Sequence, residues 1–305
     1  MTVSLYCSPT HLKVVAGSAD ANSVKVNDFA MYALPEGAMI NGIITDGDAM
    51  VRFLSEVGAK MNILRRDALL VIDTNSIRSK VMDVPGVSEH KLLEFISRDL
   101  GAFTEEEAGD VFDYTVMRGR LENGGSRILA VAVDREILRA YRNTFSSAGF
   151  NLRNINIGVN AVNKIARVSQ HLMTGARVLA IVDDRNLTLM LYENGEYKIT
   201  NKYRLFNEDD TPEWRTEIGN NISSVIQFQK GQRPDETISA VYFAGLSVQQ
   251  TIAIAETLAY LDIQIGSFDL SSRVRLSNKS AEKAAGFNPG KYLLNLGVML
   301  KGKGR

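Results

Sequence analysis

The stretch from residue 177 to residue 203 constrains the fold more than any other part of the chain. A short continuous apolar run, Val178–Val182, is typical of a buried strand, and Leu187–Tyr192 is a second such run after a polar turn. An Asn-Gly pair follows at position 194 and strongly favours a hairpin, because both residue types tolerate the positive φ of a two-residue turn. A third strand over Tyr197–Tyr203 completes a predicted three-stranded meander.

The start of the chain follows the same plan. Val3–Tyr6 is an apolar strand, Cys7–His11 a turn, Leu12–Ala16 a second strand and Val24–Leu34 a third. The two units share the same order of predicted strands and turns but little sequence identity, so the internal repeat is weak. Duplicated domains that face each other across a cleft would produce it.

Composition sets limits on size and on partners. The chain has 305 residues, which is enough for two domains or for one large domain with an insertion. Its hydrophobic (45%) and charged (23%) fractions are those of an ordinary globular protein. Because 35 basic side chains balance 35 acidic ones, no overall field favours nucleic acid or an anionic lipid surface as a partner.

Cysteine usage and the apolar runs bear on the compartment. The single cysteine, Cys7, excludes internal disulfides and fits a reducing environment. The first residues lead into a strand without the charged and apolar regions of a signal peptide. No apolar run approaches the roughly 20 residues that span a bilayer. We therefore expect a cytoplasmic protein.

Residues 85–155 are typical of a small separate unit. Apolar positions at helical spacing follow Ser88 and Asp134, and strands are predicted over Tyr114–Met117 and Ile128–Val133. The order strand, helix, strand, strand, helix, strand suits a small α+β subdomain inserted into a larger domain.

The second half ends with alternating helices and strands. Thr211–Gln229 is the clearest amphipathic helix, and a strand (Ala240–Ala244), a helix (Val248–Leu261) and a closing helix (Tyr292–Leu300) follow. The predicted domains are 1–84 and 156–177 for the first large domain, 85–155 for the insertion, 178–275 for the second large domain, and 276–305 for a C-terminal helix that returns to the first.

Several segments, in the same order along nearly the whole chain, resemble one family. They are LPEG at 34–37 with NGIITD at 41–46, Val84-Pro85-Gly86 with the following acidic helix, Asp113-Tyr114 with Ile128–Val133, Ala148-Gly149-Phe150, Glu217 to Gln229, and LGVMLKG at 296–302. The chain thereby resembles the PilM family, the cytoplasmic actin-like proteins of type IV pilus assembly, which are similar to the FtsA family.

The resemblance implies a fold and a role. The fold is α/β and actin-like (RNase H-like), with duplicated domains around a cleft and a small α+β subdomain inserted in the first domain. The role is that of a cytoplasmic scaffold in a type IV pilus or related type II secretion system. It docks the cytoplasmic N-terminal tail of a PilN-like membrane protein, contacts other assembly components and reaches the inner face of the cell membrane only through that partner. An oligomer is compatible with this role.

The nucleotide motifs of the family are degraded here. Its first phosphate loop reads D-I-G-x-x-x-x-K; this chain keeps Lys13 but has Tyr6 for the aspartate and Ser8 for the glycine. In the second loop Asp183 matches, whereas Arg185 replaces a glycine. Glycine lets backbone N–H groups approach a phosphate, and a magnesium site needs a carboxylate nearby. We therefore expect weak or absent ATP binding, no other cofactor and no enzymatic activity.

The degenerate cleft has eight candidate residues: Ser8, Thr10, Lys13, Asp183, Arg185, Asn186, Gly245 and Ser247. Lys13 and Arg185 retain charges that could hold a phosphate. Simpler interpretations stand beside this one: a solvated Lys13, and an Asp183-Asp184 pair in which only one side chain faces the cleft, because adjacent strand residues point to opposite sides. Cys7 is expected to be a packed thiol rather than a nucleophile. The three histidines lack metal-ligand spacing.

The resemblance also implies a partner groove between the first domain and the inserted subdomain, near Lys80–Pro85 and Asn154–Gly158. Its candidate residues are Met82, Val84, Asn154 and Ile155. The alternative function is an active ATPase or sugar kinase of the same fold. Such an enzyme needs intact phosphate glycines and a catalytic aspartate in its cleft, and the sequence offers neither.

Overall fold

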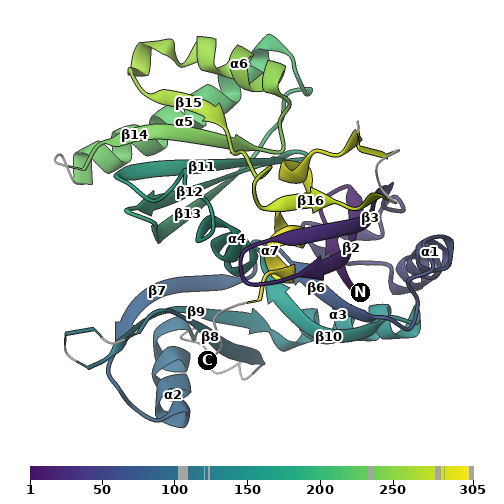
Figure 1. The fold of residues 1–305 in the computed structure, drawn as a ribbon. Coiled ribbons are helices and arrows are strands. Elements are labelled where there is room, and N and C mark those ends of the chain that lie inside the picture. The colour runs from purple at the N-terminus through teal and green to yellow at the C-terminus, as the bar shows by residue number, and fades with distance from the viewer. Residues whose placement is uncertain are drawn as a thin grey trace.

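The computed structural model describes residues 1–101, 109–119, 121–122, 124–232, 236–278, 283–284 and 286–301. Two large sheets form the two halves of the molecule, and a smaller sheet projects from the first half (Figure 1). The first sheet has the strand order β10-β6-β1-β2-β3-β16. Its strands are β1 (Thr2–Cys7), β2 (His11–Ala19), β3 (Val24–Ala33), β6 (Asp67–Ile72), β10 (Asn151–Ile157) and β16 (Val274–Leu276).

The second sheet repeats this plan. Its order is β13-β12-β11-β14-β15. The strands are β11 (Ala176–Asp183), β12 (Asn186–Glu193), β13 (Glu196–Arg204), β14 (Ile238–Ala244) and β15 (Gln264–Ser267). In both sheets three antiparallel strands in succession are extended by two strands parallel to the first, so the duplication expected from the sequence is confirmed.

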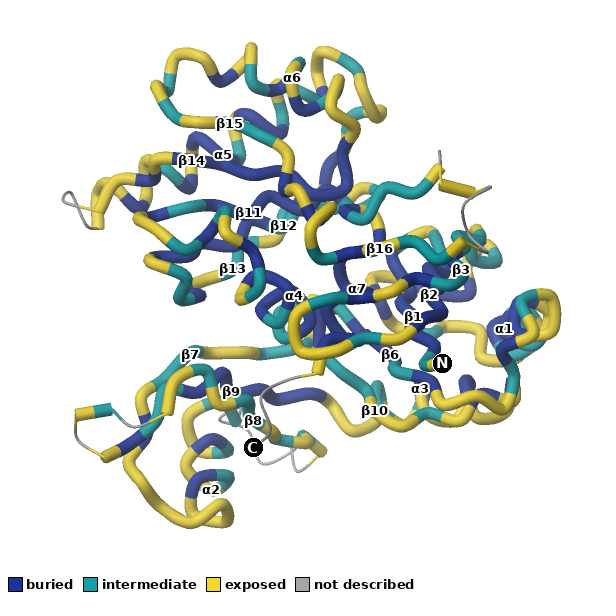
Figure 2. Tube along the Cα trace, viewed as in Figure 1, coloured by how far each residue is buried: buried dark blue, intermediate teal, exposed yellow. Residues whose placement is uncertain are grey.

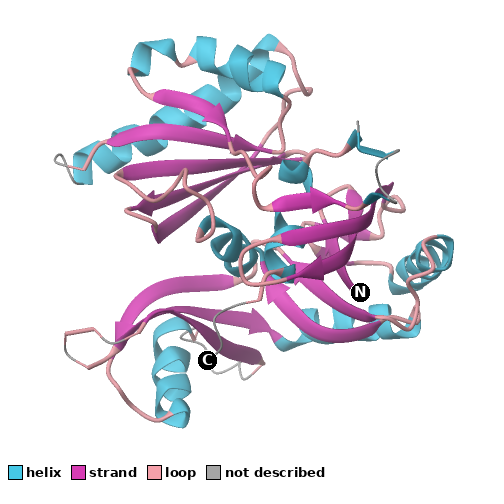
Figure 3. Cartoon of the chain, in the orientation of Figure 1, coloured by secondary structure: helices cyan, strands magenta, loops and turns pink. Residues whose placement is uncertain are grey.

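Helices cover the outer faces of the sheets (Figure 3). In the second half, alternate β11 residues such as Val178 and Ala180 pack in a core with α5 (Pro212–Gln232) and α6 (Val248–Thr257). Trp214 on α5 is 1% exposed in this core. The intervening residues Leu179 and Ile181 face the other way and join the core of the first half. The period-two alternation of one strand therefore serves both cores.

The first half is built around β1, β2 and β6. Two helices, α4 (Gly158–Ala166) and α7 (Leu293–Met299), pack against each other, and α7 also contacts β1 and β2. The preceding η4 (Pro289–Tyr292) touches strands of both sheets. The C-terminal segment thus returns to the first half; residues 302–305, the end of the predicted 276–305 range and of the tail motif, lie outside the described residues.

The third sheet, with strand order β7-β9-β8, forms the inserted subdomain. Its elements are β7 (Arg78–Val84), α2 (Glu89–Leu100), β8 (Asp110–Arg118) and β9 (Ser126–Asp134). The helix α2 covers one face through a small core that includes Val84, Leu92 and Ile96. Figure 2 shows that most of this subdomain's helix is exposed, in contrast to the buried strands of the two large sheets.

The predicted limits of the insertion, 85 and 155, do not match the sheets. β7 pairs with β9 along its whole length, so the subdomain begins about seven residues earlier. At the other end α3 (Arg135–Ser147) packs on α1 (Gly47–Lys60), and β10 pairs in parallel with β6 in the first sheet. The prediction that 85–155 forms one insertion is therefore wrong at both ends: β7 to β9 constitute it.

Local signals place the element ends. Asp46 accepts a hydrogen bond from the N–H of Ala49 at the start of α1, as expected of an N-cap. Asn194 and Gly195 have φ values of 50° and 80° and close the β12–β13 hairpin. Two short strands, β4 (Met39–Ile40) and β5 (Ile43–Ile44), and the turn η2 (Ala259–Leu261) complete the fold. Within the described ranges, no helix is long and apolar enough to cross a membrane.

Candidate functional site

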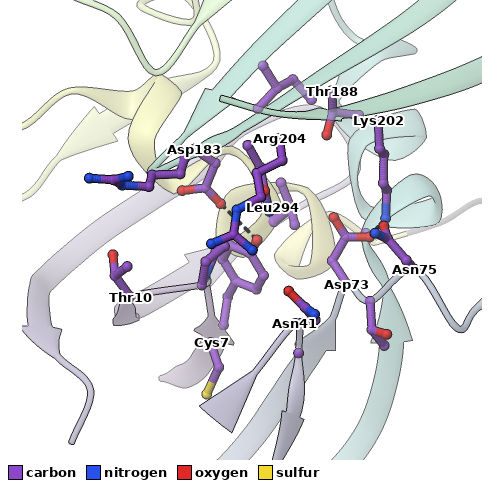
Figure 4. Close-up of a pocket in the computed structure, with 18 of the residues that line it drawn as sticks. Cys7, Thr10, Asn41, Asp73, Asn75, Asp183, Thr188, Lys202, Arg204 and Leu294 are labelled. Carbon is purple, nitrogen blue, oxygen red and sulfur yellow. Dashed lines mark hydrogen bonds and ion pairs between the residues drawn. The ribbon is translucent and has the colours of Figure 1, made fainter. Parts of the chain in front are cut away.

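A cavity of about 320 Å³ lies between the two halves, at the ends of β1, β6 and β11. Figure 4 shows Asp183 and Thr10 on one side of this cavity and Asp73, Asn75 and Lys202 on the other. Its walls come from both halves of the chain, and four of the eight candidate residues line it: Thr10, Asp183, Arg185 and Asn186.

Asp183 at the end of β11 binds two groups of the first half. The Tyr6 hydroxyl donates a hydrogen bond to Asp183 Oδ2 at 2.7 Å, and the Lys13 ammonium forms an ion pair with Oδ1. The side chains of Lys13 and Asp183 are only 4% and 13% exposed. Burial, reinforced by the negative charge of Asp183, raises the pKa of Tyr6 well above its usual value, so this phenol is a neutral donor. Lys13 is therefore buried and paired, and the expectation of a solvated lysine is wrong.

Asp184 binds the same loop from the adjacent position. Its Oδ2 accepts hydrogen bonds from the Ser8 hydroxyl at 2.6 Å and from the Thr10 backbone N–H at 3.0 Å. The Nδ1 of His11 lies 3.3 Å from Oδ1. Burial alone raises the pKa of Asp184, but the donated hydrogen bonds and the charges of Lys13 and His11 outweigh it and lower that pKa.

The two aspartates thus both face the first loop, contrary to the expectation that one would be only a turn residue. The reason is the backbone of Asp184, whose φ of 52° lies in the left-handed region and turns its side chain to the same side as that of Asp183. The donors that a phosphate would require, a loop N–H and a hydroxyl, are already bound to a carboxylate of the chain itself. The arrangement joins the halves of the molecule through charge-assisted hydrogen bonds.

The other predicted cleft residues separate into two groups. Arg185 and Asn186 line the cavity beside Asp183. Gly245 and Ser247 have local roles in the β14–α6 turn instead. A Cβ on Gly245 would lie 2.0 Å from the carbonyl oxygen of Val182, so the turn needs a glycine. Ser247 is the N-cap of α6, where its hydroxyl accepts from the N–H of Gln250.

Sequence reasoning missed Asp73. It follows β6, the strand parallel to β1, and its Oδ1 accepts from the Lys202 ammonium of β13 at 2.6 Å. A carboxylate directly after a central strand was the available signal, because the carboxyl ends of parallel strands meet at one edge of a sheet. The pair adds a second ionic link between the halves. Among the described residues, no group of three or more His, Cys, Asp or Glu side chains could hold a metal ion.

A larger groove of about 970 Å³ separates the inserted subdomain from the first half. One wall is the face of β8 and β9 opposite α2, with Val111, Thr115 and Met117. The other wall is β10 with α4, which contributes Asn160 and Lys164, and α3 contributes Leu138 and several arginines. β8 and β10 are the terminal strands of their sheets, so each presents an edge without a strand neighbour in the described chain.

Two of the four predicted groove residues line this groove. Asn154 and Ile155 on β10 do so, as expected from their position. Val84 is 2% exposed in the core of the subdomain, and Met82 lines a separate depression that faces β13 and α5. The prediction is wrong for these two residues because β7 lies at the far edge of the small sheet, with β9 between it and the groove. The wall comes from β8 instead.

No protein-family model matches the chain, and no curated protein matches its sequence. Solved structures do match. The PilM–PilN type IV pilus biogenesis complex contains a chain with a TM-score of 0.78 at 14% identity, over 98% of this chain and 97% of that one. A Bacteroides thetaiotaomicron protein with an actin-like ATPase fold gives 0.51 at 10% identity, over 91% and 90%.

A third match is the cytoplasmic domain of EpsL, an inner-membrane component of the Vibrio cholerae type II secretion system. It has a TM-score of 0.48 at 12% identity, over 99% of this chain and 98% of that one. Full coverage of the PilM–PilN chain at a TM-score of 0.78 includes both large sheets and the inserted subdomain. The chain therefore has the actin-like fold in its PilM-like form, with duplicated domains around a cleft and an α+β subdomain inserted in the first.

Proposed function

We propose that this protein is a non-catalytic scaffold that docks a short extended peptide in the groove between β8 and β10. The peptide belongs to the cytoplasmic tail of a PilN-like membrane protein, and the scaffold serves a type IV pilus or a related secretion system. The protein is cytoplasmic and reaches the inner face of the membrane through this partner. The similarity to PilM in a complex with PilN supports the choice of partner.

The observation that carries the proposal is the groove itself. It combines an apolar sheet face, including Val111 and Met117, with the free edge of β10. An extended peptide gains backbone hydrogen bonds from a strand edge, while its alternate side chains fill apolar positions. The volume of about 970 Å³ is of the size that accommodates several side chains.

The cleft between the halves supports the non-catalytic part of the proposal. Asp183 is bound to Lys13 and Tyr6, and Asp184 already accepts the hydrogen bonds of the Ser8 hydroxyl and the Thr10 N–H in the first loop. A nucleotide phosphate would have to displace a carboxylate that is already hydrogen-bonded and partly buried, and it would then lie against that negative charge. The active ATPase or kinase therefore remains the second, weaker candidate.

The test is a titration of a synthetic peptide that covers the cytoplasmic tail of the PilN-like protein encoded in the same genome. We expect micromolar affinity, because a disordered tail loses entropy when it binds. Val111→Arg places a long charged side chain in the groove and should weaken binding at least about tenfold, equivalent to about 1.4 kcal/mol. Val111 is 36% exposed, so the variant should fold.

The matched control is Val87→Arg. Val87 is 43% exposed, lies just before α2 and is not among the residues that line the groove. Its variant should bind like the unmodified protein. Absence of binding to the unmodified protein, or equal weakening by the two substitutions, would contradict the proposed groove.

A further inference from the structure

The groove carries positive charges that lack partners. Lys164 lies on α4 and Arg167 directly after it, one turn apart, and both line the groove. Neither forms an ion pair with any residue in the described part of the chain. Arg135 and Arg142 approach from α3, also without a described acidic partner, whereas Arg139 pairs with Glu136.

Negative charge is scarce in the same groove. Asp113 on β8 is the single carboxylate among the described lining residues, and it already has an interaction of its own. A solvated cation on an open surface needs no partner, and the exposed arginines of α3 fit that description. Lys164 differs, because its side chain is only partly accessible to water.

The environment of Lys164 disfavours an unpaired charge. Partial burial, together with the adjacent positive charge of Arg167, lowers the pKa of Lys164 below its usual value. Arg167 itself is exposed and acts here as the neighbouring positive charge. A partly desolvated cation next to a like charge is stabilised when an anion binds beside it.

The position of Lys164 relates it to the bound peptide. β10 ends at Ile157 and α4 begins at the next residue, Gly158, without a connecting loop. A peptide paired with the edge of β10 therefore extends toward α4, and its alternate side chains point to the groove wall that carries Lys164. A side chain near that end of the peptide meets two cations and no described carboxylate of α4.

We infer that the docked segment carries an aspartate or glutamate whose carboxylate pairs with Lys164, beside Arg167. This inference rests on the proposed function and specifies the chemistry of the ligand at that groove. The apolar wall of β8 and β9 binds the apolar side chains of the segment, and the α4 end selects a carboxylate. The ion pair fixes the direction and register of the peptide along β10.

The experiment compares two peptides and two variants. One peptide is the tail of the PilN-like protein; the other has each aspartate and glutamate replaced by asparagine and glutamine. Lys164→Gln should weaken binding of the acidic peptide about tenfold and leave the affinity for the amide peptide unchanged within about twofold. In a double-mutant cycle this difference is the coupling energy between Lys164 and the carboxylates of the peptide. Raising the salt concentration should weaken the binding of the acidic peptide only.

Lys91→Gln is the matched control. Lys91 is exposed on α2 of the inserted subdomain and does not line the groove. Its variant should bind both peptides as the unmodified protein does. Circular dichroism of each variant verifies that it is folded.

The outcomes separate this inference from the proposed function. Equal affinity of the acidic and amide peptides, or a tail that binds tightly and contains no carboxylate side chain, overturns the charge inference and leaves the docking function standing. Failure of both peptides to bind the unmodified protein overturns both. Binding to phosphatidylglycerol vesicles that is lost in Lys164→Gln would assign these cations to a lipid surface and also overturn the inference.

Discussion

The Lys13–Asp183 ion pair allows a quantitative test of how the two halves are joined. Lys13→Met removes the ammonium and leaves Asp183, 13% exposed, with the Tyr6 hydroxyl as its described donor. Loss of one partner of a buried ion pair costs about 3–5 kcal/mol. Because Tyr6 still donates, we expect the lower end, about 3 kcal/mol, which lowers the urea midpoint by about 1–2 M at an ordinary m-value.

The assay is urea unfolding followed by circular dichroism and by the fluorescence of Trp214. Trp214 is buried in the second half, whereas circular dichroism reports on both, so coincident transitions show that the halves unfold together. A second variant, Lys13→Met with Asp183→Asn, removes both charges and retains an acceptor for Tyr6. It should regain at least half of the lost stability.

An exposed ion pair provides the control. Lys80 and Asp99 pair at 2.8 Å with side chains 55% and 31% exposed, so Lys80→Met should change the free energy of unfolding by less than about 0.5 kcal/mol. A loss below about 1 kcal/mol for Lys13→Met would refute the argument, because it would mean that water or another group readily replaces the ammonium.

Three further predictions concern the same cleft. The pKa of Asp184 is lowered in the folded protein, so its stabilisation is present above its unfolded pKa of about 3.9 and is lost as the pH falls through the folded value. Asp184→Asn should therefore be less stable than the unmodified protein at pH 7, by about 1–3 kcal/mol, and the difference should shrink below about pH 4 in denaturant titrations. Burial raises the pKa of Cys7 to about 12, so Ellman's reagent should modify it at pH 8 only after unfolding in urea; rapid reaction of the folded protein would contradict its burial. Purified protein with ATP and magnesium should release no measurable phosphate, whereas turnover on the order of 1 s⁻¹ would show a working enzyme.

The sequence by itself determined the local elements. The runs over Val178–Val182 and Leu187–Tyr192 and the Asn-Gly pair at 194 became β11, β12 and their hairpin neighbour β13, because each signal acts within a few residues. The repeated layout at the two ends predicted the duplicated sheets. Helix α5 followed from amphipathic spacing in the same way.

The tertiary structure decided where those elements belong. The sequence suggested that β7 precedes the insertion and that β10 ends it, but strand membership depends on which edges pair, and β7 pairs with β9 while β10 pairs with β6. Two strands that pair in a sheet show the same alternation of apolar and polar residues, so the sequence pattern of one strand does not identify the strand it pairs with. The error in the insertion limits and the misplaced Met82 and Val84 have this single cause.

The cleft and the groove depended still more on tertiary contacts. Lys13 and Asp183 are 170 residues apart, and Ser8 and Asp184 are 176 apart, so no local spacing could reveal that they meet. Adjacent aspartates on an ideal strand diverge; one positive φ at Asp184 brought them to the same side. A sequence specifies which groups are charged, whereas burial and partners, which decide what a charge can bind, arise only when distant segments pack together.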